Sequence, residues 1–251
     1  MTGDVEAGVD GVVAGAEARR GVDLETWQAF REPLGNLLSS LPEGKAEAHS
    51  WTVPQYPPVE GLAIPAQVNF VGKAANLFDL GYRLDGSISV ISKYLGTTWL
   101  WEKVRVQGGA YGAYFNFDGR SGILTFLSYR DPNLLGTLKT YDQTSEFLRK
   151  LNLSQEELAK TIIGVIGDLD SYQLPDAKGY TSMIRYLVGD TDKFRQQYRD
   201  QVFTTTVEHF RSFGEMLGKS KDTRVAVMVA AEKLAETNQE RNGWMDIKKV
   251  L

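Results

Sequence analysis

The residues best suited to polar chemistry lie in the stretch TWLWEKVRVQGGAYGAYFNF, residues 98 to 117. Arg105 falls near the end of an expected helix, Tyr111 begins an expected strand, and Gly108-Gly109 stands between them. A Gly-Gly reversal would fold the chain back so that both side chains face one space. A guanidinium and a phenol hydroxyl both donate hydrogen bonds, so the pair suits a peptide carbonyl or a developing oxyanion.

The same residues also admit structural interpretations. Arg105 would favour the C-terminus of its helix through its charge alone. Tyr111 would then be a half-buried aromatic of a strand. A third interpretation makes the glycines a phosphate cradle, although their spacing matches no known phosphate-binding loop.

Other catalytic classes find little support in the sequence. It contains no cysteine, and its two histidines are His49 and His209, which we expect to be an exposed and a structural residue respectively. The spacing leaves a Ser-His-Asp triad open, but no serine is set up locally as a nucleophile. Asp168 and Asp170 are two residues apart, so on a helix they point to different faces and form a poor carboxylate pair. Nucleotide-binding glycine motifs and a nucleophile elbow are absent.

Composition describes a globular chain with a mildly acidic surface. The 251 residues are 42% hydrophobic, and 28 Lys and Arg stand against 32 Asp and Glu, for a net charge of −4. This balance disfavours nucleic acid, which requires clustered positive charge. The longest strongly apolar stretch, Val225 to Ala231, is too short for a bilayer, so we expect no membrane segment. Residues 1–23 match neither a secretory signal nor a transit peptide.

The elements that must position the Arg-Tyr pair follow a linker. We expect residues 1–58 to form a leader and linker, with a helix over 24–38 and an extended run around Pro54, Pro57 and Pro58. Residues 59–251 are expected to form the main domain.

Three predicted elements surround the pair itself. A helix is predicted from Ser87 to about Arg105, ended by Gly108-Gly109. Strands are predicted over 111–117 and 122–128, joined as a hairpin by Asp118-Gly119. The helix prediction rests on one apolar stripe, formed by Ile88, Ile91, Leu95 and Trp99.

Further elements complete the domain. A strand over 66–72 is predicted ahead of the helix, with Val68 and Phe70 on one face, and another over 224–230, with Val225, Val227 and Val229 on one face. Helices are predicted to start at Asp131-Pro132, at a Ser154–Glu157 capping box, at Asp176 and at a second capping box over 205–208. The order of elements predicts an α+β fold, with helices packed on one face of a mainly antiparallel sheet.

Several longer motifs resemble a known family. They are QVNFVGKA (67–74), WLWEKVRVQGGAYGAYFNFD (99–118), FLSYRDPN (126–133), DSYQLPDAKGY (170–180) and ERNGW (240–244). Over about residues 59–251 the chain resembles the C-terminal domain of the presequence-protease branch of the pitrilysin family, which are zinc metallopeptidases. Complete members of that branch are several times longer than this chain.

The resemblance implies a specific role. Such proteases are clamshells of two homologous halves, and a His-x-x-Glu-His motif in the N-terminal half binds Zn²⁺. This sequence has no such motif, so the resemblance makes it the last domain of the half without zinc, inactive alone. Arg105 and Tyr111 match the family residues that reach the peptide at the zinc. They would hold the scissile carbonyl and stabilise the tetrahedral intermediate, with Gly108 and Gly109 beside them as substrate-binding positions.

The expected partners are therefore the zinc-bearing half and unfolded peptides, among them targeting peptides. The branch works in mitochondria and chloroplasts, and bacterial relatives also exist. Asp131, Asp170 and Asp176 are expected to be structural. The alternative is a non-catalytic structural or binding subunit on the same fold, which would have no use for a cation and a phenol aimed at a chamber. A zinc-motif half encoded upstream would favour the enzyme.

Overall fold

The computed structural model describes residues 24–42, 50–52 and 54–250. These residues fall into two units. One contains residues 24–42, 50–52, 54 and 171–195, and the other contains 55–170 and 196–250. The expected domain boundary at residue 59 stays a prediction. The larger unit carries the sheet and both members of the Arg-Tyr pair.

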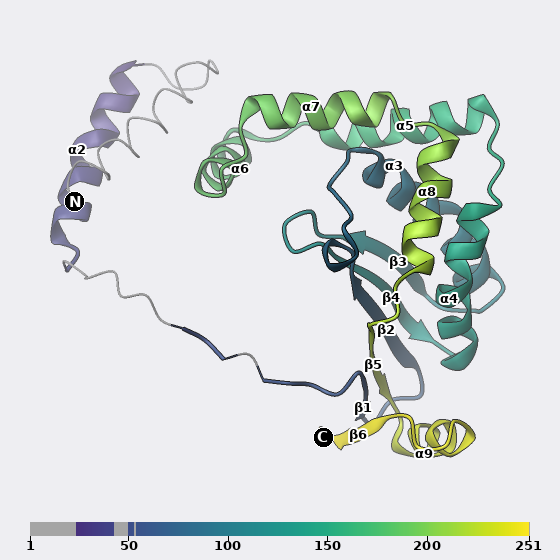
Figure 1. The fold of residues 1–251 in the computed structure, drawn as a ribbon. Coiled ribbons are helices and arrows are strands. Elements are labelled where there is room, and N and C mark those ends of the chain that lie inside the picture. Colours follow the sequence, from purple (N-terminus) through teal and green to yellow (C-terminus); the bar gives the residue numbers. More distant parts are fainter. Residues whose placement is uncertain (1–23, 43–49, 53, 251) are drawn as a thin grey trace. The chain divides into compact units, whose positions relative to one another are not determined.

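Helices and strands come in runs along the chain, and the helices α4 to α8 follow one another between β4 and β5 (Figure 1). The helices are α2 (Leu24–Ser40), η1 (Phe78–Leu80), α3 (Ser87–Tyr94), η2 (Leu95–Trp99), η3 (Trp101–Val106), α4 (Leu135–Arg149), α5 (Gln155–Leu169), α6 (Pro175–Leu187), α7 (Asp192–Phe203), α8 (Val207–Gly218) and α9 (Ala231–Glu240). The strands are β1 (Val59–Ala63), β2 (Asn69–Asn76), β3 (Gly112–Phe117), β4 (Ile123–Asp131), β5 (Thr223–Val229) and β6 (Asp246–Lys249). In the described part of the chain, no helix has both the length and the apolar character needed to cross a bilayer.

One mixed sheet organises the larger unit. Its strand order is β3-β4-β2-β5-β1-β6. The pairs β3–β4, β4–β2 and β2–β5 are antiparallel, whereas β1 runs parallel to both β5 and β6. The α+β prediction is confirmed, with the correction that β1 and β6 give the sheet a parallel part, so it is mixed.

The helices cover one face of this sheet, as predicted. Val225, Val227 and Val229 of β5 are buried on this face. Val227 pairs with buried Val71 of β2, and Val229 pairs with buried Ala63 of β1. Helices α3 and α4 contact β3 and β2 on this face. At Gly61 of β1 a Cβ would meet Leu234 of α9, so α9 packs on the same face. Apolar alternation with period two therefore defines the core.

The strand predictions are correct in kind but shifted in two places. The strand predicted over 66–72 begins at Asn69, and Val71 rather than Phe70 points into the core. The predicted hairpin is present as β3–β4. Its connection is longer than Asp118-Gly119, because Asp118 bonds to Ile123 across the loop and the left-handed residue is Gly122, with φ 74°.

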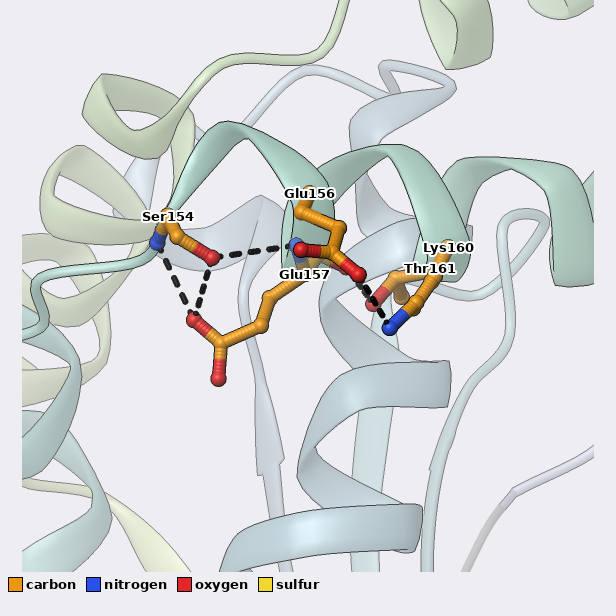
Figure 2. Close-up of polar contacts among 5 residues, drawn as sticks. All are labelled: Ser154, Glu156, Glu157, Lys160 and Thr161. Atoms are coloured by element: carbon orange, nitrogen blue, oxygen red, sulfur yellow. Dashed lines mark hydrogen bonds and ion pairs between the residues drawn. The ribbon is translucent and has the colours of Figure 1, made fainter.

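The capping box at Ser154 is confirmed. The Ser154 hydroxyl accepts a hydrogen bond from the Glu157 backbone N–H at 3.2 Å, and the Glu157 carboxylate accepts one from the Ser154 N–H at 3.0 Å (Figure 2). Ser154 also donates from its hydroxyl to that carboxylate. These bonds hold the pKa of Glu157 below its usual range. In the same first turn of α5, Glu156 forms an ion pair with Lys160, which lies one turn further along the helix.

Two other helix starts differ from the predictions. Asp131 does not cap a helix that begins at Pro132. It ends β4, is fully buried, and accepts hydrogen bonds from the Asn133 N–H at 2.8 Å and the Thr137 hydroxyl at 2.6 Å, while α4 begins at Leu135. The second capping box is one residue later than predicted.

That box belongs to α8 and uses Thr206 with His209. The Thr206 N–H donates to His209 Nδ1 at 3.0 Å. The register moved because the Thr205 hydroxyl donates instead to the carbonyl of Gln201 at the end of α7. His209 is therefore structural, as predicted, whereas His49 lies outside the described residues.

Candidate functional site

The helix that carries Arg105 is anchored by its buried side. The predicted stripe is present, with Ile88, Ile91 and Leu95 buried. After Tyr94 the helix widens into two π-helical segments, η2 and η3. Leu100 and Val104 are fully buried and continue the anchored side through these segments. π-Helical turns are rare in proteins, and those that occur often lie at functional sites. This irregularity therefore makes the region a candidate site.

Trp99 adds a second anchor. Its ring stacks on Phe147 of α4 at 4.3 Å between centroids, and its Nε1 donates to Thr144 Oγ1 at 3.0 Å. The turn before Arg105 is therefore fixed to α4 on the core side. The opposite side of η3, which carries Trp101, Arg105 and Val106, lines an open cavity.

The Gly108-Gly109 turn reverses the chain as predicted. Gly109 has φ 78°, in the left-handed region that favours glycine, and its N–H donates to the Arg105 carbonyl at 2.9 Å. A Cβ on Gly108 would lie 2.5 Å from the Val104 carbonyl oxygen. The Gly108 carbonyl also accepts a hydrogen bond from Asn133 Nδ2 at 2.5 Å. Both glycines are thus required by the tight path of the backbone.

Tyr111 precedes the edge strand β3. Its N–H donates to the carbonyls of Tyr129 and Arg130 at 3.1 and 3.3 Å, so two consecutive residues of β4 face Tyr111. Arg130 has φ 49°, unusual for a residue with a side chain. The Tyr111 ring meets Tyr129 edge to face at 5.8 Å and stays 65% exposed.

Arg105 and Tyr111 line one cavity of about 920 Å³. Gly109 also lines it, but Gly108 does not. The complete lining is Ala66, Gln67, Val68, Trp101, Arg105, Val106, Gly109, Ala110, Tyr111 and Arg130. This lining holds two guanidiniums and no carboxylate, in a chain whose net charge is negative. The cavity therefore offers hydrogen-bond donors and positive charge, which suit carbonyl or carboxylate oxygens.

Trp101, Gln67 and Arg130 also line the cavity, although none of them was predicted to be a site residue. The Cζ atom of Arg105 lies 3.9 Å from the centroid of the Trp101 ring, which is a close cation–π stack. The four-residue spacing of Trp101 and Arg105 was a usable signal, because residues at that spacing are neighbours on a helix. Arg130 enters the cavity through an irregularity in strand pairing, for which the sequence carries no local signal.

The aspartates expected to be structural lie outside the cavity lining. Asp168 pairs with Lys93 at 2.8 Å, and Asp170 accepts two bonds of 2.6 Å from the Arg199 guanidinium, which holds the pKa of Asp170 below its usual range. Asp176 sits in the first turn of α6, where a negative charge stabilises the helix. Asp168 and Asp170 thus bind separate cations and form no paired acid site.

The described residues do not fit a metal ion. Within residues 24–42, 50–52 and 54–250, no three His, Cys, Asp or Glu side chains gather closely enough to hold one. The sequence has no His-x-x-Glu-His motif either. No step of a reaction can therefore be assigned to a metal on this part of the chain.

Several solved structures share the fold of this chain. Pitrilysin aligns with 91% of this chain and 25% of its own, at a TM-score of 0.57 and 13% identity. The peptidase M16 inactive domain from Pseudomonas fluorescens aligns with 84% of this chain and 52% of its own, at a TM-score of 0.58 and 17% identity. At these identities the likeness shows the fold alone, which is that of an M16-type peptidase domain.

The family follows from sequence. The family described as PreP C-terminal domain matches residues 59–232, so the chain belongs to the presequence-protease C-terminal domain family. It is 53% identical over 193 residues to presequence protease 1, chloroplastic/mitochondrial, of Arabidopsis thaliana, and 32% identical over 228 residues to protein HypA of Clostridium perfringens. These alignments cover 76% and 90% of this chain, which spans 18% and 23% of the length of the two relatives.

Proposed function

We propose that this chain is the C-terminal portion, without zinc, of a presequence-protease-like metallopeptidase that degrades targeting peptides and other short unfolded peptides. It contributes Arg105 and Tyr111 to an active site whose Zn²⁺ is bound by the other half. The observation that carries the proposal is that Arg105 and Tyr111 line one cavity of a domain of this family. The proposed compartment is the organelle matrix or stroma, or the cytoplasm of a bacterium.

The chemistry of the two side chains supports a role in binding the scissile carbonyl. The Arg105 guanidinium presents several N–H donors in a fixed plane and carries a positive charge. Tyr111 presents one hydroxyl donor from the far side of the Gly108-Gly109 turn. When the carbonyl carbon becomes tetrahedral, its oxygen gains negative charge, and both donors stabilise that charge more than they stabilise the neutral carbonyl.

The turn supplies the rigidity that this role needs. The cavity side of η3 is fixed by buried Leu100 and Val104, and the start of β3 is fixed by its bonds to β4. The backbone segments that carry the two donors are therefore held in place before the reaction, and such preorganisation is what makes oxyanion stabilisation effective. The absence of a metal-binding group among the described residues fits a portion that completes a site and does not contain it.

The test is reconstitution. The purified chain is assayed with a quenched fluorescent peptide, alone and mixed with a zinc-bearing portion of the protease that lacks this domain. We expect no cleavage by the chain alone and cleavage on mixing. Arg105→Ala and Tyr111→Phe should each lower kcat by about 10²-fold with little change in KM, because each removes one donor of the transition state.

Matched controls separate the donors from their surroundings. Lys103→Ala removes a cation from the same helix, and Tyr114→Phe removes a hydroxyl from the strand that follows Tyr111; neither residue lines the cavity. Both controls should keep the wild-type kcat. Zinc-dependent cleavage by the chain alone would refute the proposal that the other half binds the Zn²⁺. An unchanged kcat in Arg105→Ala and Tyr111→Phe would favour the structural subunit.

A further inference from the structure

Arg105 makes the shortest contact between a guanidinium and an aromatic ring among the described residues. Among the residues that the structure describes, its guanidinium forms no ion pair and no side-chain hydrogen bond. Its contact is the face of the Trp101 ring, 3.9 Å from Cζ to the ring centroid. Arg241 also stacks on a tryptophan, Trp244, but at 4.7 Å.

We propose that Trp101 is a positioning residue for Arg105, an inference that rests on the proposed function. The indole face holds the guanidinium plane in the cavity while every N–H donor stays available to the peptide. A carboxylate partner would hold the arginine equally well, but it would occupy two of those donors. Stacking leaves the edge of the guanidinium free, because the contact is made through its face.

Two arginines of the same unit, Arg199 and Arg211, show the contrast. Arg199 donates two N–H groups to Asp170, and Arg211 donates to the Leu151 carbonyl. Each of these side chains is fixed, but its donors are occupied. Arg105 combines a fixed plane with unused donors, which is the arrangement that a carbonyl-binding residue needs.

Trp101 is itself well supported. It follows Leu100, which is fully buried, on a helix whose next turn is anchored by buried Val104. Its neighbour Trp99 is pinned by Phe147 and Thr144 on the opposite side of the helix. Trp101 is 46% exposed and belongs to the cavity lining, so a substitution there leaves the core untouched. The backbone that carries the Trp101 ring is therefore held in place beside Arg105.

The first test needs no activity. Protons beside the face of an indole ring are shifted upfield in NMR spectra, so the side-chain resonances of Arg105 report the stack directly. These resonances are assigned in the full chain by their disappearance from the spectrum of the Arg105→Lys variant. We expect the upfield shift to be lost in Trp101→Leu and retained in Trp101→Phe, with Tyr114→Leu as the control. An unchanged Arg105 resonance in Trp101→Leu would overturn the proposal.

The second test uses the reconstituted peptidase. Trp101→Leu should lower kcat by about 5-fold, and Trp101→Phe should stay within about 2-fold of wild type, since a stack of this kind contributes modestly at a half-exposed site. In the Arg105→Ala background, Trp101→Leu should have no further effect, because there is no guanidinium left to position.

The outcomes separate this inference from the proposed function. If Trp101→Leu lowers kcat as much in the Arg105→Ala background as in the wild type, or acts on KM alone, then Trp101 binds the peptide directly and the positioning role is wrong. If Arg105→Ala leaves kcat unchanged, the proposed function fails, and the NMR shift still decides whether Trp101 orders Arg105. Circular dichroism of each variant verifies that it is folded.

Discussion

The Gly108-Gly109 turn gives the sharpest prediction about stability. Gly109 has φ 78°, and a residue with a side chain in the left-handed region costs about 1–2 kcal/mol. Gly109→Ala should therefore lower the free energy of unfolding by about that amount. In a protein of this size each kcal/mol moves the melting temperature by about 2–4 °C, so we expect a fall of about 2–8 °C.

Two further substitutions grade the effect. Gly109→Asn should be milder, since asparagine tolerates the left-handed region better than alanine does. Gly108→Ala should cost about 1–3 kcal/mol for a different reason, because its Cβ would lie 2.5 Å from the backbone oxygen of Val104 and the turn would have to shift.

The assay is thermal and urea unfolding of the purified variants, followed by kcat in the reconstituted peptidase. Gly167→Ala is the control, because Gly167 lies in α5 with open space around it. That substitution should stabilise the protein by up to about 1 kcal/mol through helix propensity. If Gly109→Ala is as stable as Gly167→Ala, the left-handed conformation at position 109 does not require glycine.

Three other predictions concern the rest of the fold. Ser154→Ala should cost about 1 kcal/mol through loss of the cap and should raise the pKa of Glu157 toward its usual value, both measurable by urea unfolding and NMR titration. Folding lowers the pKa of Glu157, so the contribution of its carboxylate to the free energy of unfolding is full above pH ~4.5 and is lost as the pH falls through the folded pKa. The difference in stability between wild type and variant should therefore narrow in acid. Asp131→Ala leaves the Asn133 N–H and the Thr137 hydroxyl without their acceptor. It should lower the free energy of unfolding by about 2–3 kcal/mol in the same unfolding assay. A variant as stable as the wild type would contradict these hydrogen bonds. EDTA should leave the melting temperature of the isolated chain unchanged, and a fall would reveal a structural metal.

Local signals predicted the parts of the fold that depend on neighbours in the chain. The stripe of Ile88, Ile91 and Leu95 and the capping box at Ser154 are set by short-range geometry, and both were correct. The placement of Arg105 and Tyr111 around a Gly-Gly turn was also visible, because a glycine pair between a helix and a strand has few alternatives.

The features that failed or were missed depend on distant parts of the chain. The π-helical widening of η2 and η3 leaves no mark on the apolar stripe. Arg130 reaches the cavity because two residues of β4 face Tyr111, which is a property of strand pairing. Nothing local to residues 59–63 indicates a strand, since β1 exists through β5 and β6, its partners near the other end of the sequence.

The parallel pairing of β1 also governs how this domain can fold. Val59 pairs with Val225 and Glu60 with Asp246, so β1 leaves the ribosome long before either partner strand. Until those strands arrive, both edges of β1 lack backbone partners and the sheet stops at β2. Such long-range pairing slows folding, and during synthesis it leaves exposed a strand edge that can pair with another chain. A chain cut before Thr223 would therefore retain Arg105 and Tyr111 while losing the half of the sheet that completes the domain.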